Sequence, residues 1–162
     1  MDKTDSITGV QILNSSEVKL VEKPWGWEKW IADGSPNFRY ALKEIFIRAP
    51  HKSSVQVHQA KEETNFVQKG RGILHYSPTS FDLNKYLDGN MSDEKVSEIV
   101  NSLEKEDLLP GKVFHMKPGF IHSVEAIEDL LMIEASSTEL DDVFRLRDDS
   151  GRGHGRIDGE HS

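Results

Sequence analysis

The sequence contains no cysteine. This absence excludes disulfide bonds, cysteine-based zinc sites, iron–sulfur clusters and thiol catalysis. Any metal site in this chain must therefore use nitrogen and oxygen ligands. A chain without disulfides also fits a reducing compartment, and we expect a cytoplasmic protein.

Long apolar runs and basic clusters are missing as well. No stretch approaches the roughly 18–20 apolar residues that a membrane span needs, and the start, MDKTDSITGV, lacks the apolar segment of a signal peptide. The formal net charge is -8, whereas a nucleic-acid surface needs clustered Lys and Arg. We therefore expect neither a membrane nor a nucleic acid as partner. A small anionic substrate stays compatible, because one or two local cations can hold a phosphate.

What the sequence does contain is a series of short strand patterns separated by Gly and Pro. The 162 residues suit one domain, and Phe38–Arg48 also favours a strand by its β-branched and aromatic content. Many short strands with turn chemistry between them are typical of an antiparallel sandwich or barrel. The other predicted strands are Ser53–His58, Thr64–Lys69, Gly72–Tyr76, Lys112–Lys117, Ile121–Ala126 and Leu130–Ser136.

One segment departs from the strand pattern. Residues Ser92–Lys105 place apolar side chains at helical spacing, and Ser92 is a suitable N-cap. We predict a surface helix near residues 92–105, inserted between two strands and packed on the barrel exterior. Residues 1–21 are expected to form an N-terminal arm, residues 22–152 the barrel domain, and residues 153–162 a flexible tail.

Four side chains form a candidate metal site. Side chains alternate between the two faces of a strand, so Gln56 and His58 are expected on one side and their valine neighbours on the other. Glu63 follows a short turn and begins the next strand, and the Pro118-Gly119 turn delivers His122 at the start of a distant strand. An amide oxygen, two imidazoles and a carboxylate suit zinc, manganese, iron, cobalt or nickel. Four protein ligands leave positions for water or substrate, as in catalytic sites.

At these residues the sequence resembles the cupin superfamily. The first cupin motif is matched by Gln56, His58, Glu63 and Gly70, and the second by Pro118, Gly119 and His122. The closer resemblance is to the C-terminal isomerase part of type II phosphomannose isomerases and their stand-alone relatives. It is carried by Gln56, His58, Lys61 and Glu63, by the opening Lys23, Pro24, Trp25, Gly26 and Glu28, and by the closing segment 139–152. The resemblance implies an all-β fold, the cupin double-stranded β-helix or jelly-roll barrel.

The resemblance further implies a metal-dependent sugar-phosphate isomerase, similar to mannose-6-phosphate isomerase, that works through an enediol. One divalent metal ion, zinc or manganese first, would polarise the substrate oxygens. Lys61 matches the basic position of the family motif and is a candidate to orient the substrate. His75 and His115 are candidate proton shuttles if both face the cavity, and Arg145 and Arg147 are candidate phosphate holders.

Two other functions remain open at this point. One is an iron-dependent oxygenase cupin with two histidines and a carboxylate. The other is a non-enzymatic carbohydrate-binding cupin, which the insert and Ser123, where the family often has arginine, leave open. Small cupins commonly pair as homodimers, and the N-terminal arm could cover a sheet edge in such a dimer.

Overall fold

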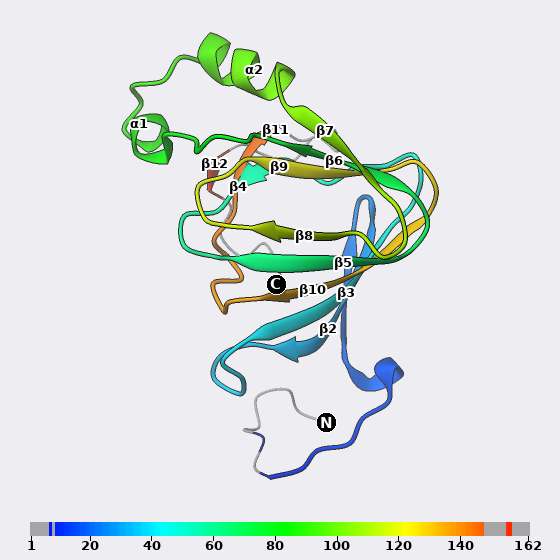
Figure 1. Cartoon of the computed structure of the whole chain (residues 1–162). Coiled ribbons are helices and arrows are strands. Elements are labelled where there is room, and N and C mark those ends of the chain that lie inside the picture. Colours follow the sequence, from blue (N-terminus) through cyan, green and yellow to red (C-terminus); the bar gives the residue numbers. More distant parts are fainter. Residues whose placement is uncertain (1–6, 8, 148–154, 157–162) are drawn as a thin grey trace.

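The computed structural model describes residues 7, 9–147 and 155–156, and it contains two six-stranded antiparallel sheets packed face to face (Figure 1). Sheet A has the order β1-β2-β3-β10-β5-β8 and sheet B the order β12-β11-β4-β9-β6-β7. The strands of sheet A are β1 (Lys19–Lys23), β2 (Gly26–Asp33), β3 (Ala41–Ile47), β10 (Leu130–Ser136), β5 (Glu63–Lys69) and β8 (Val113–Met116). Those of sheet B are β12 (Gly155–Arg156), β11 (Phe144–Arg147), β4 (Val55–Val57), β9 (His122–Ala126), β6 (Gly72–Tyr76) and β7 (Glu104–Leu108).

The inner faces of both sheets build the main core. Sheet A contributes Ile45, Val67 and Met132, and sheet B contributes Leu74 and Val124. Burying apolar surface between two sheets stabilises the sandwich and fixes the strand register, because a slip of one residue would turn these side chains to solvent. Toward one end of the sandwich the inner positions change from apolar to charged, and there the candidate site lies.

Two short helices cover the outer face of sheet B (Figure 1). They are α1 (Leu83–Leu87) and α2 (Asp93–Asn101), and Ser92 caps α2 by accepting a hydrogen bond from the Lys95 N–H. Val96 and Val100 of α2 are buried against the outward valines of β4. The predicted surface helix is therefore confirmed, with its apolar stripe packed on the barrel.

The helix ends earlier than its spacing predicts. Residues 104 and 105 belong to β7, which pairs antiparallel with β6 from Gly72–Leu108 to Tyr76–Glu104. Backbone pairing with an existing strand outweighs weak local helix preference, so the end of α2 was set by tertiary contacts.

The predicted strands agree with the structure to different degrees. β6 and β10 have the predicted bounds, while β4 is only three residues long. The arm predicted for residues 1–21 includes a 3₁₀ turn (Ser15–Glu17) and runs into β1, so its C-terminal boundary cuts a strand. The predicted flexible tail 153–162 lies outside the described residues except for β12. Among the described residues, no helix is both long and apolar enough to cross a bilayer.

Candidate metal centre

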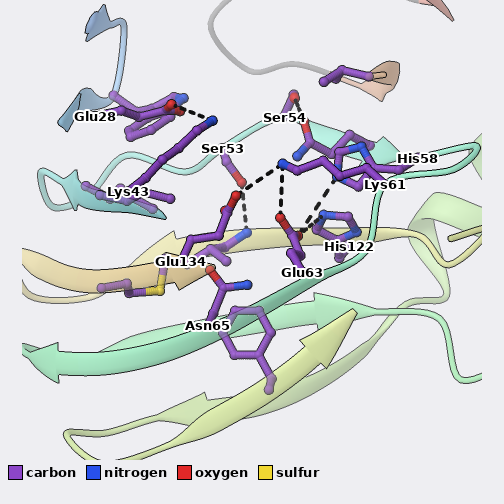
Figure 2. A pocket seen from close by; sticks show the side chains of 18 residues that line it. Glu28, Lys43, Ser53, Ser54, His58, Lys61, Glu63, Asn65, His122 and Glu134 are labelled. Carbon is purple, nitrogen blue, oxygen red and sulfur yellow. Dashed lines mark hydrogen bonds and ion pairs between the residues drawn. The ribbon is translucent and has the colours of Figure 1, made fainter. Parts of the chain in front are cut away.

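A cavity of about 70 Å³ lies between the sheets and is lined by 18 residues from both sheets and the segments that connect their strands (Figure 2). Its polar lining includes His58, Lys61, Glu63, His122 and Glu134. Charged side chains in such a place cost free energy unless they are paired or bind an ion. Their concentration in one buried cavity therefore marks a candidate functional site.

Strand alternation brings the predicted ligands to this cavity. Val55 and Val57 pack under the helices, so Gln56 and His58 point inward and line the cavity. Gln56 pairs directly with His122 of β9, which places the two motifs on neighbouring strands. Glu63 opens β5 after the turn that follows His58, as the spacing predicted.

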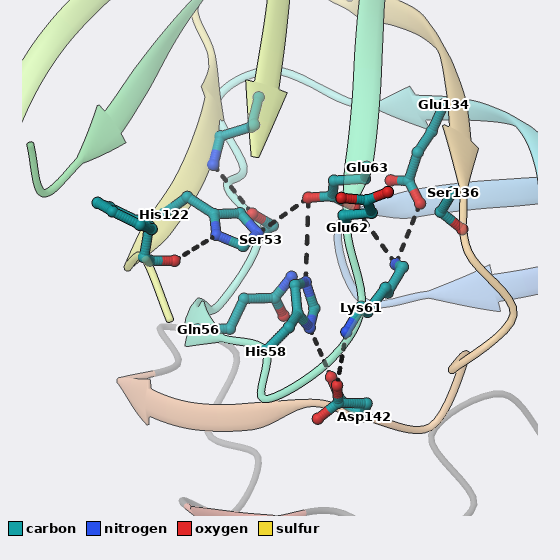
Figure 3. A network of polar contacts seen from close by, with 12 residues as sticks. Ser53, Gln56, His58, Lys61, Glu62, Glu63, His122, Glu134, Ser136 and Asp142 are labelled. Atoms are coloured by element: carbon teal, nitrogen blue, oxygen red, sulfur yellow. Dashed lines mark hydrogen bonds and ion pairs between the residues drawn. The ribbon is translucent and has the colours of Figure 1, made fainter. Parts of the chain in front are cut away.

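His58, Glu63 and His122 converge on one point (Figure 3). Their ligand atoms all lie within 4.8 Å of one another. Oε1 of Glu63 is 3.1 Å from Nε2 of His122 and 3.9 Å from Nε2 of His58. All three residues are buried; Nε2 of His58 has no hydrogen-bond partner, and Nε2 of His122 has the Glu63 carboxylate beside it.

The other ring nitrogens show why these Nε2 atoms suit a metal. Nδ1 of His58 contacts the backbone carbonyl of Asp142, and Nδ1 of His122 lies 3.1 Å from that of Phe120. A carbonyl oxygen only accepts, so each Nδ1 carries a hydrogen, and a metal ion at the cluster would bind the lone pair of each Nε2. Metal-binding histidines are held in this way by a backbone carbonyl at the second nitrogen. The cluster can therefore hold a divalent metal ion.

The pKa shifts of His58 and Glu63 also agree with a metal-binding cluster. Burial and the neighbouring His122 lower the pKa of His58 from 6.5 to about 4. Burial alone would raise the pKa of Glu63, but Lys61 and the two imidazoles hold it well below its usual value. A neutral His58 imidazole and an ionised Glu63 carboxylate are the forms that bind a metal.

Gln56 lies in the cavity wall beside this cluster. Its Oε1 accepts a hydrogen bond of 3.0 Å from the Ser54 hydroxyl. An amide oxygen has two lone pairs, so one remains for a fourth ligand bond. The structure brings Gln56 to the cavity, and its role as a ligand stays a prediction.

Two buried lysine–carboxylate pairs complete the polar lining (Figure 2). Nζ of Lys61 lies 3.1 Å from Glu134 and 3.3 Å from Glu63, and Nζ of Lys43 lies 3.2 Å from Glu28. Burial and the charge of Glu63 raise the pKa of the Glu134 carboxyl to about 7. Lys61 thus lies in the site, as predicted.

Sequence reasoning missed Glu134, Lys43 and Glu28 as cavity residues. Each is a charged residue among the inward-facing apolar positions of its strand. Glu28 lies in the aromatic-rich segment that forms β2, Lys43 in β3, and Glu134 in the segment LLMIEAS of β10. A lone charge at an inward position of a strand was the signal that could have found them.

His75 and His115 do not face the cavity, so the condition for their shuttle role is not met. Leu74 and Met116 occupy the inward positions of β6 and β8, and alternation turns the histidines outward. There His75 contacts Glu125 at 2.8 Å and His115 contacts Thr64 at 2.8 Å.

The two predicted phosphate holders also lie elsewhere. Arg147 donates a hydrogen bond of 2.9 Å to Asn101 at the end of α2. Arg145 is buried on β11 beside Gln56, yet it is not among the residues that line the cavity. The structure therefore does not join either arginine to the metal cluster.

Comparison with known proteins identifies the fold. No family profile and no curated protein matches the sequence. Among solved structures, oxalate decarboxylase from Bacillus subtilis matches with a TM-score of 0.62 and 12% identity over 89% of this chain and 34% of that one. The capsular polysaccharide assembling protein CapF from Staphylococcus aureus matches with a TM-score of 0.60 and 13% identity over 81% of this chain and 34% of that one.

A third match covers nearly a whole protein. KdgF from Halomonas sp. has a TM-score of 0.57 and 16% identity over 82% of this chain and 98% of that one. This chain thus spans about a third of the first two proteins and almost all of the third. These neighbours have the cupin fold, and the chain shares it, as predicted.

Proposed function

We propose that this chain is a metal-dependent isomerase that interconverts an aldose and a ketose, with a sugar phosphate as substrate. The observation that carries the proposal is the buried cluster of His58, Glu63 and His122, with the carboxyl group of Glu134 in the same cavity. Such a site offers both things that the reaction needs, a position for a Lewis acid and a group that moves a proton.

The three clustered residues, with Gln56 as fourth ligand, would hold the ion. A bound divalent metal would stabilise negative charge on the adjacent carbonyl and hydroxyl oxygens of the substrate. Zinc and manganese are the first candidates, and iron, cobalt and nickel share this ligand preference.

Glu134 is the residue we assign to the proton transfer. It is buried in the cavity and is not part of the metal cluster. A carboxyl whose pKa lies at about 7 can both take and return a proton at neutral pH. In the reaction it would take the proton from the hydroxyl-bearing carbon next to the aldose carbonyl and return it to the former carbonyl carbon of the enediol. The hydroxyl proton of the first carbon would pass through water to the former carbonyl oxygen, so that a ketone and a new hydroxyl result.

Lys61 positions this carboxyl. Its Nζ lies between Glu134 and Glu63, so it bridges the proton-transfer group and the metal cluster. An ammonium has three donors, and the third can hydrogen-bond a substrate oxygen that gains charge in the enediol-like state.

The cavity also restricts how a substrate enters. A volume of about 70 Å³ holds only a few water-sized groups. The carbonyl end would enter, while the phosphate of a hexose phosphate stays toward the mouth. Since neither arginine lines the cavity, the proposal assigns no phosphate contact to Arg145 or Arg147.

The test is turnover by metal-loaded protein. Zinc- or manganese-loaded chain is incubated in D₂O with mannose 6-phosphate, fructose 6-phosphate and the unphosphorylated sugars, and products are read by NMR. We expect interconversion of the phosphorylated pair with solvent deuterium entering the product, and loss of both after chelation. Loaded protein that turns over no hexose or pentose phosphate would refute the proposal.

A second candidate is an iron-dependent oxygenase, and the ligand set supplies the observation that favours it. Two histidines and one carboxylate with open positions are also the ligands of non-haem iron(II) enzymes, and a solved iron(II) form of HppE matches this fold with a TM-score of 0.56. Oxygen uptake by the iron-loaded chain with a sugar-derived substrate would favour this function. Saturable sugar binding without turnover would instead favour a carbohydrate-binding protein.

A further inference from the structure

Asn65 lies on β5 among the charged residues of the cavity. Side chains alternate along this strand, so Glu63, Asn65 and Val67 face inward and are buried, while Phe66 faces outward. Asn65 is only 2% exposed, and it lines the cavity. Figure 2 shows its side-chain amide pointing into the cavity. A neutral polar group therefore lies inside a site whose other polar groups are mostly charged.

The Asn65 amide has no partner in the protein, unlike the other polar groups around it. The Ser54 hydroxyl donates to Gln56, the Ser53 hydroxyl accepts from a backbone N–H, and both buried lysines contact carboxylates. Among the residues that the structure describes, none hydrogen-bonds the Asn65 side chain. Burying an amide without a hydrogen bond costs free energy, and buried polar groups nearly always have a partner. The amide is therefore placed to bind a ligand in the cavity.

Strand register puts Asn65 next to the groups that would carry out the reaction. Asn65 pairs directly with Glu134 of β10 on one side and with Phe114 of β8 on the other. Side chains opposite each other on paired strands have Cβ atoms about 5 Å apart. Glu63 of the metal cluster lies two residues earlier on the same face, about 7 Å along the strand. A ligand that reaches the metal and Glu134 is therefore within reach of Asn65.

The chemistry of an amide selects a hydroxyl group as its partner. The side chain of Asn65 offers one acceptor oxygen and two donor hydrogens without charge, and a hydroxyl group both donates and accepts. In the proposed reaction the metal and Lys61 take the oxygens of the two reacting carbons. The next oxygen along the sugar is the hydroxyl of the third carbon, which these groups leave unbound.

We propose that Asn65 hydrogen-bonds the hydroxyl of the third carbon and so selects substrates that carry it; this inference rests on the proposed isomerase function. A sugar without that hydroxyl would leave the amide unpaired in the closed site, and such a loss lowers reactivity more than the loss of an apolar contact. The ring of Phe114, on the other side of Asn65, offers no strong substitute partner.

The test compares two substrates in matched variants. Metal-loaded protein is given mannose 6-phosphate and its 3-deoxy analogue, and both kcat/KM and the dissociation constant are measured. For the wild type we expect kcat/KM to be about 10- to 100-fold lower with the analogue. Asn65→Leu keeps a similar volume without polar atoms and should distinguish the two sugars less than threefold. Met132→Leu, which changes another cavity side chain without removing a hydrogen-bonding group, should discriminate as the wild type does.

The outcomes separate this inference from the proposed function. Turnover by the wild type, with equal discrimination in wild type and Asn65→Leu, would overturn the role of Asn65 alone. Binding without turnover would refute the isomerase, and the ratio of the two dissociation constants would still decide for or against Asn65. A wild type that binds neither sugar would overturn both.

Thermal unfolding of the ligand-free protein shows whether Asn65 has a structural role instead. Asn65→Leu should melt at or above the wild-type temperature, since it removes a buried amide without a partner. If leucine does not pack and the variant melts lower, Asn65→Ala repeats the comparison of the two sugars. Wild-type discrimination by Asn65→Ala would then overturn the proposal.

Discussion

His58 and Asp142, 84 residues apart in the chain, are joined by the contact between the His58 Nδ1 and the Asp142 backbone carbonyl. The carboxylate of the same Asp142 accepts hydrogen bonds from the backbone N–H groups of Gln59, Ala60 and Lys61 at 3.0, 2.6 and 2.9 Å. One residue thus orients a metal-binding imidazole and also holds the turn that leads to Lys61 and Glu63 (Figure 3).

This double role predicts the effect of Asp142→Asn. These backbone bonds outweigh burial and lower the pKa of Asp142, which shows that they favour the charged form. The amide retains one acceptor oxygen and turns donors toward N–H groups, so we expect a loss of about 2 kcal/mol in unfolding free energy. Metal affinity should fall about 10- to 100-fold, as for other residues that orient a ligand. Urea unfolding and calorimetric metal titration check this, and Asp141→Asn, at an exposed neighbour, should change neither.

Metal binding should depend on His122 and not on the histidines outside the cavity. Cobalt(II) added to the wild-type chain should give visible absorption and raise the melting temperature, since a ligand at 100 times its dissociation constant stabilises by about 2.7 kcal/mol. His122→Asn should lose both effects. His75→Asn should keep them, because His75 faces outward toward Glu125. Equal cobalt spectra from the two variants would contradict the proposed ligand set.

The stability of the metal-free protein should respond to pH through two opposing groups. The pKa of His58 falls from 6.5 to about 4 on folding, so its contribution is lost as pH falls through that window. The pKa of Glu134 rises from 4.5 to about 7, so its contribution is lost as pH rises. Between pH 4.5 and 6.5 the two nearly cancel.

Removing one of the two groups should therefore leave an unfolding free energy that changes with pH, with opposite signs in the two variants. In Glu134→Gln, unfolding free energy should rise with pH by about 1 kcal/mol per unit between pH 4.5 and 6.5. In His58→Asn it should fall with pH by a similar amount. Urea unfolding of metal-free samples at pH 5 and pH 6 measures both slopes, and slopes of the same sign would show that the two groups do not titrate in this way.

Substitutions in the two buried lysine–carboxylate pairs should affect kcat differently. Glu134→Gln should lower kcat by a factor of about 10² to 10⁴ and abolish deuterium incorporation, because it removes the proton-transfer group. Its cobalt spectrum should remain, since Glu134 is outside the metal cluster. The matched control Glu28→Gln breaks a similar pair, Lys43–Glu28, in the same cavity; we expect it to keep most activity. Comparable losses of kcat in both variants would assign Glu134 a structural role only.

Gly70, which matches the glycine of the first cupin motif, should be essential for folding rather than for the metal. It has a φ of 86°, and an added Cβ would lie 2.0 Å from the backbone oxygen of Asp129. Gly70→Ala should therefore cost several kcal/mol, which is more than the roughly 1 kcal/mol of left-handed strain alone. Gly111 has a φ of 93° and nothing within 4 Å of such a Cβ, so Gly111→Ala measures the strain by itself. Thermal unfolding of the two variants gives the comparison.

The sequence alone predicted strands β3 to β6 and β8 to β10, the inserted helix and the convergence of His58, Glu63 and His122, because these depend on local periodicity and on short turns. It did not predict β1, β2, β7 or β11. Alternation along one strand determines which face of the sheet a side chain occupies, and the Pro118-Gly119 turn determines where β9 begins. The site beyond these residues was decided by tertiary structure. Which face of β6 and β8 turns inward, and therefore where His75 and His115 lie, depends on partners far away in the chain.

Glu134, Lys43 and Glu28 show the same limit. Each is a lone charge at an inward position of its own strand, but only the packing of the two sheets buries it in the cavity and gives it a charged partner. A sequence pattern specifies the direction of a side chain relative to its own backbone. The distance between side chains on different strands follows from sheet order and register, which long-range burial sets.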